Sequence, residues 1–145
     1  MTQDETRIRE IFAAHVAAMR AKDADALVAR FAPDAVTFTL APPLSNSGEA
    51  VTDPAGVGAW LAGFTGEMDY EFRDLELAIG EDVAFAHGLT RLSATPQGDT
   101  EQFDLWFRVT VGLRKIDGEW LVTHEHQSTP FYMDGSFRAA VDLKP

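Results

Sequence analysis

Residues 100–131, TEQFDLWFRVTVGLRKIDGEWLVTHEHQSTPF, decide the fold of this chain. Asp117 and Gly118 separate two runs in which apolar and polar residues alternate. Asp-Gly between such runs is a strong hairpin signal, because a two-residue type I′ turn needs positive φ at both central residues. The turn predicts that Ile116 pairs with Glu119 and that two long antiparallel strands follow.

An unbroken register from this turn sorts the side chains onto two faces, because alternate residues of a strand point to opposite sides. His124 and His126 then share an apolar face with Leu105, Phe107, Val109, Val111, Leu113 and Ser128. The polar face carries Trp106, Arg108, Thr110, Glu125 and Gln127, with Arg108 and Glu125 as a cross-strand ion pair. A bulge in the long strand would move the two histidines relative to Val109.

Composition narrows the classes of function. The chain has 145 residues, which suits a single domain spanning 1–145, and no cysteine for disulfides or thiolate chemistry. The net charge of −11 argues against binding to nucleic acid or to an anionic membrane. The charged N-terminus does not look like a signal peptide, and no apolar run is long enough to cross a bilayer, so a cytoplasmic location is expected.

The rest of the chain predicts three helices and three more strands. Helices are expected from about Gln3 (Thr2 and Glu5 have the spacing of a capping box), over Asp25–Phe31, and from Pro54 to about Gly66. Strands are expected over Ala35–Leu40, Asp69–Ile79 and from Val83, with 41–52 as a loop. The apolar phase of 69–79 changes at Arg73-Asp74, which indicates a β-bulge. We therefore expect an α+β cone: a strongly curved antiparallel sheet wrapped around the helices, with a hollow suited to a ligand.

Several segments resemble the nuclear transport factor 2-like superfamily, and within it the SnoaL-like and ketosteroid-isomerase-like proteins. They are FAAHVAAMRAKDADALVARFAPDAVTF at 12–38, the region around Gly48 and Trp60, WFRVT at 106–110 and GEWLVTHEHQSTPF at 118–131. The tail YMDGSFRAAVDLKP resembles the ending of a bacterial branch mostly of unassigned function. The resemblance implies the cone fold and a small-molecule pocket, while the superfamily includes isomerases, dehydratases, cyclases and plain binding proteins.

The chain departs from the isomerases at their catalytic positions. The position of their helix tyrosine matches His15, and that of their catalytic aspartate matches Thr39. A threonine does not shuttle protons near neutral pH as a carboxylate does, which argues against steroid isomerisation. SnoaL-like cyclases use an acid/base residue in the cavity, and imidazole is suited to that task.

All four histidines fall on predicted inward or apolar phases, so they are the candidate site. His126 and His15 are the predicted catalytic residues, with an isolated core histidine as the simpler interpretation of each. The predicted ligand-binding residues are Thr39, Trp60, Tyr70, His87, His124 and Ser128, although the aromatic ones equally suit an ordinary core. Asp34 suits a turn.

No cofactor or metal is expected, because the spacing of His124 and His126 matches no established metal signature and Glu125 points to the other face. The expected partners are a small apolar molecule in the pocket and a second copy of the chain, bound through Trp106, Arg108, Thr110 and Glu125 on the outer sheet face. The function hypothesis is an isomerase, cyclase or dehydratase that acts on a small apolar carbonyl compound by histidine acid/base catalysis. The alternative is a non-catalytic binding protein with the same pocket.

Overall fold

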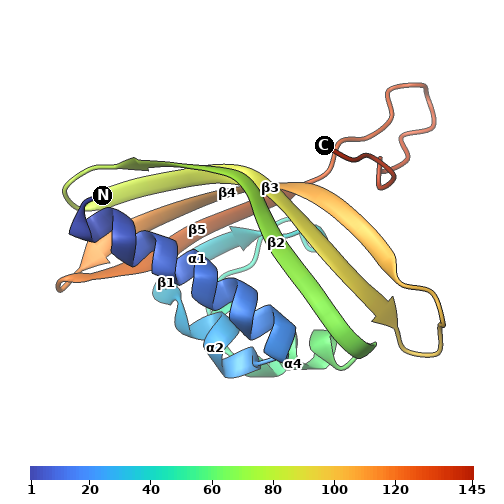
Figure 1. The fold of residues 1–145 in the computed structure, drawn as a ribbon, viewed down its shortest axis with the longest axis horizontal. Coiled ribbons are helices and arrows are strands. Elements are labelled where there is room, and N and C mark those ends of the chain that lie inside the picture. Colours follow the sequence, from blue (N-terminus) through green and yellow to red (C-terminus); the bar gives the residue numbers. More distant parts are fainter.

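The computed structural model describes residues 1–145 as a curved five-stranded sheet with helices on its concave side (Figure 1). The strands lie in the order β1-β5-β4-β3-β2. The elements in chain order are α1 Gln3–Ala21, α2 Ala24–Ala29, β1 Phe31–Phe38, α3 Glu49–Thr52, α4 Pro54–Leu61, β2 Phe64–Ile79, β3 Val83–Pro96, β4 Phe103–Ile116 and β5 Glu119–Ser128. The predicted α+β cone is confirmed. None of the helices is both long and apolar enough to span a membrane.

Several local expectations need correction. The helix expected to reach about Gly66 ends at Leu61, and Phe31, expected to end a helix, begins β1. The sheet is mixed, since β1 pairs with β5 in parallel while the other four strands form the expected antiparallel meander. A short fourth helix, α3, lies within the segment 41–52 that was predicted as a loop. The parallel pair joins residues about ninety positions apart, such as Thr37 and Glu125, and short-range sequence patterns do not reveal such pairings.

The hairpin turn is as predicted, but the register is not. Asp117 and Gly118 both have positive φ, and Ile116 pairs with Glu119. The pairing holds as far as Leu113 with Val122 and then shifts, so that Thr123 is an extra residue. Beyond this bulge Gly112 lies opposite His124 and Val111 lies opposite Glu125. One extra residue exchanges the two faces of the strand, so the prediction that His124 and His126 face inward is wrong.

The bulge predicted at Arg73-Asp74 in β2 is confirmed. The β2–β3 register shifts between Arg73 and Glu76, and Asp74 has a φ of 55°. The bent strand approaches Gly88 of β3 so closely that a Cβ there would lie 3.1 Å from the Arg73 carbonyl oxygen. Together the two bulges bend the sheet around α1.

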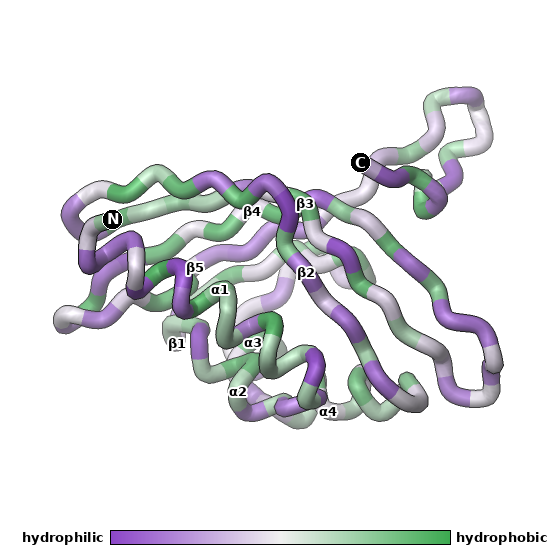
Figure 2. Tube along the Cα trace, in the orientation of Figure 1, coloured by the Kyte–Doolittle hydropathy of each residue, from purple (hydrophilic) through white to green (hydrophobic).

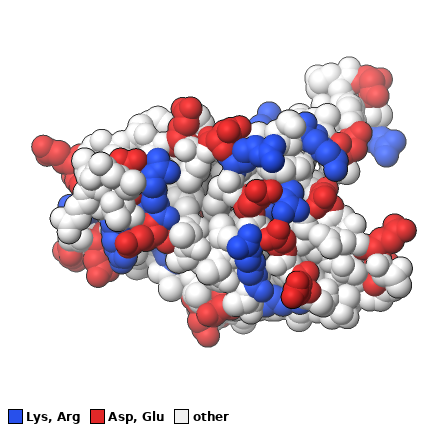
Figure 3. Space-filling model, viewed as in Figure 1, with Lys and Arg blue, Asp and Glu red and all other residues white.

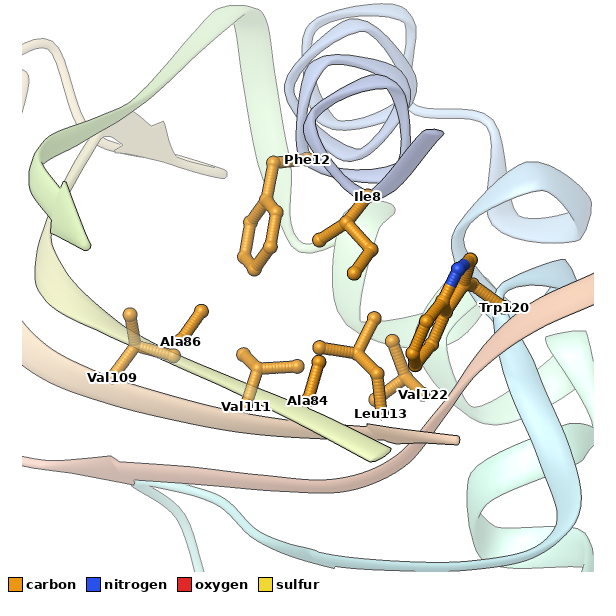
Figure 4. Packing of buried hydrophobic residues seen from close by; sticks show 9 residues of the cluster. All are labelled: Ile8, Phe12, Ala84, Ala86, Val109, Val111, Leu113, Trp120 and Val122. Carbon is orange, nitrogen blue, oxygen red and sulfur yellow. The ribbon is translucent and has the colours of Figure 1, made fainter. Parts of the chain in front are cut away.

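The core lies between α1 and the concave face of the sheet. Ile8 and Phe12 project from α1 toward small residues of β3, Ala84 and Ala86, which let the helix approach closely (Figure 4). The other members of this cluster are Val109, Val111, Leu113, Trp120 and Val122. Hydrophobic and hydrophilic residues alternate along much of the sheet, as expected for strands with one buried face (Figure 2).

Candidate functional site

The interior of the cone holds a small group of polar side chains, and His15 of α1 lies at its centre. The His15 side chain is buried, and its ring stacks on Tyr70 with 5.0 Å between the ring centroids. Phe72 borders the same ring at 5.6 Å. Burial lowers the pKa of His15 well below 6.5, and the nearby Arg30 guanidinium lowers it further. The imidazole is therefore neutral at neutral pH.

A buried ion pair lies beside this histidine. Arg30, between α2 and β1, places Nη2 at 3.3 and 3.4 Å from the two carboxylate oxygens of Glu125. The side chains are only 12% and 6% exposed. Arg30 also donates to the Leu27 carbonyl and lies over the Phe31 ring, and Gln127 donates to Glu125. Charge-assisted bonds are usually about 2.7–2.9 Å long, so this pair is loosely made for a buried one.

Two hydroxyl groups complete the cluster. Tyr70 is buried, and its burial, together with the charge of Glu125, raises the pKa of its phenol, which stays protonated. Thr90 of β3 is fully buried, and its Oγ1 has no hydrogen-bond partner, although it lies near enough to Tyr70 to act on the phenol's pKa. A buried hydroxyl without a well-formed hydrogen bond costs free energy, so a polar atom of a ligand that bonded to Thr90 Oγ1 would relieve that cost.

Only two of the predicted site residues, His15 and Tyr70, lie together in the interior. The other three histidines were predicted to face inward and do not. His124 lies on the outer face, where Nδ1 donates to the Val36 carbonyl over 2.6 Å, and His87 is exposed near Glu76 at 3.7 Å. His126 is exposed beside Phe38. Their roles in catalysis or binding stay predictions, but none of them can act with His15 in this arrangement.

The remaining predicted ligand-binding residues also lie outside the interior. Thr39 and His126 line an open hollow of about 440 Å³ at the end of β1, together with Phe38, Leu40, Ala41, Pro42, Pro43, Leu44 and Gln127. Ser128 lies on the outer face, where it accepts from Arg108 Nε. Trp60 is 43% exposed and meets Phe64 edge-on.

Sequence reasoning missed Arg30, Thr90 and the inward position of Glu125. Glu125 was assigned to the outer face as the partner of Arg108, and it is instead buried with Arg30. The predicted inward direction of Trp120 and Val122, which precede the bulge, is correct. The one sign of the bulge in the sequence is that an unbroken register places His124 and His126 opposite valines. The structure has no group of three or more His, Cys, Asp or Glu side chains placed to hold a metal ion.

Comparisons with known proteins agree with this architecture. The family model described as a SnoaL-like domain matches residues 8–132. The chain belongs to the SnoaL-like family. No curated protein matches it in sequence.

Solved structures show how widely this SnoaL-like fold is shared. A nuclear transport factor 2-like protein of unknown function from Pseudomonas putida is 34% identical, with a TM-score of 0.86, over 100% of this chain and 99% of that one. A candidate scytalone dehydratase from Novosphingobium aromaticivorans is 16% identical (TM-score 0.74, 94% and 90% covered). A candidate dehydratase from Streptomyces avermitilis is 15% identical (TM-score 0.73, 86% and 95% covered). At such low identity the last two show the fold alone.

Proposed function

We propose that this SnoaL-like protein encloses a small, mostly apolar carbonyl compound inside the cone and that His15 moves a proton on it. The observation that supports this is the meeting of a neutral imidazole, two protonated hydroxyls and an ion pair in an otherwise apolar interior. An isolated core histidine does not usually have several polar and charged neighbours, and clusters of this kind are typical of sites that move protons.

The groups divide naturally into two tasks. Neutral His15 can accept a proton from the carbon next to a carbonyl group, and the hydroxyls of Tyr70 and Thr90 can donate hydrogen bonds to the oxygen on which negative charge develops. Arg30 adds positive charge nearby, and Glu125 prevents that charge from being left unpaired. Isomerisation, cyclisation and dehydration of a carbonyl compound can all begin with this step. Thr39 and Ser128 were predicted to bind the ligand, and we propose Thr90 in their place because these two lie outside the interior.

Enclosure of the cluster affects how a ligand reaches it. His15 is 7% exposed and Glu125 is 5% exposed, so binding of a molecule beside them requires the surrounding side chains to move apart. A closed interior excludes water, which strengthens each of the polar contacts.

The test is exchange of carbon-bound protons in deuterated water, followed by proton NMR over a panel of small cyclic ketones and enones. We expect the native protein to speed exchange next to the carbonyl, and His15→Gln to lose at least about 100-fold of that rate. His87→Gln is the matched control, since His87 is an exposed histidine of the outer face. A folded His15→Gln protein that exchanges as fast as the native one would disprove the role of His15.

The pH dependence supplies a second readout. Because the pKa of His15 lies well below 6.5, the rate should stay level as the pH falls through 6.5 and decline only at lower pH. A general base with the ordinary pKa of an imidazole would begin to lose its activity near pH 6.5.

A non-catalytic ligand-binding protein is the second candidate. It is favoured by the fact that both oxygens of Glu125 already accept hydrogen bonds, from Arg30 and Gln127, which leaves the interior without a free carboxylate. Native mass spectrometry of the purified protein, followed by analysis of any released compound, separates the two. A retained compound that undergoes no exchange or turnover indicates a binding protein.

Self-association through the outer sheet face is also proposed, with a smaller set of residues than expected. Trp106, Arg108 and Thr110 belong to this face, and Glu125 does not, because it is buried inside. Arg73 already covers the Trp106 ring at 4.7 Å. Thr110→Lys, which places a charge in the middle of the face, should weaken such a dimer in sedimentation velocity experiments.

A further inference from the structure

The last sixteen residues, 130–145, form an ordered arm that stands away from the body (Figure 1). Ala140 donates to the Pro130 carbonyl over 2.8 Å, and Tyr132 donates from its backbone to Arg138 over 2.8 Å. The Tyr132 hydroxyl bonds to Asp142. These bonds hold the arm in a closed loop, so its shape is set by its own backbone.

This arm exposes more apolar surface than an independent loop needs. Its exposed apolar side chains are Phe131, Met133, Phe137, Val141 and Leu143, with Met133 86% and Phe137 67% exposed. A single exposed apolar residue is ordinary, but several on one ordered projection indicate a contact surface.

The open hollow beside His126 is a surface of matching character. It is formed mainly by the segment Phe38–Leu44, and none of its lining residues carries a formal charge at pH 7 when histidine is neutral. Leu44 at its rim is 96% exposed. No residue of the arm lines it, so the arm of the same copy does not fill the hollow. Its volume of about 440 Å³ lies in the range that accommodates side chains of a partner.

Charge favours contact at these two places over others. The arm has two acidic residues, Asp134 and Asp142, and two basic ones, Arg138 and Lys144, so its net charge is zero. All of the net charge of −11 therefore belongs to residues 1–129. Two such bodies repel each other, and the neutral arm and the uncharged hollow are where two copies can meet with little repulsion. Figure 3 shows the arm standing out, at the upper right, from a body on which charged groups are frequent.

We infer that the arm of one copy occupies the hollow of a second copy, reciprocally, about a two-fold axis. Gln127 lines the hollow and the arm begins at Pro130, so the arm and the hollow of one chain lie next to each other. With a two-fold axis near Thr129, each arm reaches the hollow of the other copy. Both contacts then form together, as a closed dimer requires. Phe38 and His126 lie at the β1–β5 margin of the outer sheet face, so the contact is continuous with that face. The inference does not depend on the chemistry proposed for His15.

Cysteine cross-linking tests the exchange directly, because the chain has no cysteine of its own. Leu44→Cys and Phe137→Cys proteins, prepared separately and mixed, are treated with a short flexible bismaleimide and analysed by mass spectrometry. Ala13→Cys, on the exposed side of α1, replaces Leu44→Cys in the control mixture. We expect the Leu44–Phe137 heterodimer to form at least about tenfold faster than the control product.

Three results would contradict the exchange of arms. A native chain that is a monomer in sedimentation velocity, or equal cross-linking in the two mixtures, would overturn the inference. So would a doubly substituted Leu44→Cys/Phe137→Cys chain that cross-links within one copy, because the arm would then close on its own hollow.

A charge substitution separates this contact from the outer sheet face. Leu44→Asp should raise the dimer dissociation constant at least about tenfold, and it is safe for folding because Leu44 is exposed. A dimer that Thr110→Lys dissociates and Leu44→Asp leaves intact would place the interface on the sheet face alone and overturn the exchange of arms.

Discussion

Replacing Arg30 with methionine should be among the most destabilising single changes to a polar residue of this protein. The methionine keeps much of the apolar stem of the side chain and removes the guanidinium that pairs with Glu125. The carboxylate is 6% exposed and would be left without its cationic partner inside the cone. Such a charge is costly because neither water nor another cation can solvate it.

The structure sets the size of the effect. Breaking a buried ion pair on one side costs about 3–5 kcal/mol, and the long contacts of 3.3 and 3.4 Å place this pair at the lower end, about 3 kcal/mol. The Leu27 carbonyl also loses its Arg30 donor, which adds about 1 kcal/mol. The sum is a large part of the 5–15 kcal/mol that typically stabilises a domain, yet it should leave a folded protein to measure.

Urea unfolding followed by tryptophan fluorescence measures the loss. The midpoint should fall by about 1–4 M at an unchanged m value. The control is Arg7→Met, because Arg7 and Glu10 form a shorter pair at 2.8 Å whose side chains are 60% and 57% exposed. Exposed pairs contribute about 0–1 kcal/mol, so the control should change little despite its better distance.

A second substitution shows that the unpaired charge causes the loss. The Arg30→Met/Glu125→Gln double variant should be more stable than Arg30→Met alone, since it leaves no buried carboxylate behind. If Arg30→Met costs no more than Arg7→Met, or if the double variant is less stable than the single one, the assignment of a buried ion pair is wrong.

Three further predictions concern stability. Thr90→Val should raise the unfolding free energy by about 1 kcal/mol, because it removes a buried hydroxyl without a partner; a loss of stability in thermal unfolding would show that the hydroxyl is bonded. The pKa of His15 is lower in the folded than in the unfolded state, so its contribution to the unfolding free energy is complete above pH 6.5 and is lost as the pH falls. Below pH 6.5 the native protein should lose up to about 1.4 kcal/mol of stability per pH unit relative to His15→Gln. Parallel pH profiles of the two proteins would contradict this. Gly88→Ala should cost about 1–3 kcal/mol, because its Cβ would meet two backbone atoms at 3.1 and 3.2 Å, whereas Gly112→Ala, with its nearest contact at 3.5 Å, should cost clearly less in the same urea assay.

Local sequence patterns were sufficient for several features of the fold. The Asp117-Gly118 turn, the cap at Thr2 and the bulge near Asp74 depend on a few adjacent residues, and each lies where the sequence indicated. Such features are predictable because backbone dihedral preferences and short-range hydrogen bonds are settled within a few residues.

The candidate site was predictable only in part. His15 and Tyr70 lie in the apolar phases of a helix and a strand, and the structure buries both. Glu125, His124 and His126 follow a bulge, and a strand has a period of two, so one inserted residue reverses all three. No residue near Thr123 announces that insertion.

The sequence by itself determined most of the helices and strands, the hairpin that organises the sheet and the place of His15 in its interior. Only the tertiary structure decided which face of β5 is buried, that β1 lies parallel to β5, and that Arg30 meets Glu125 across ninety-five positions of the chain. The physical reason is that the bulge and the ion pair form only when the curved sheet packs around α1. Their stability depends on contacts between distant segments, which no short window of the sequence contains.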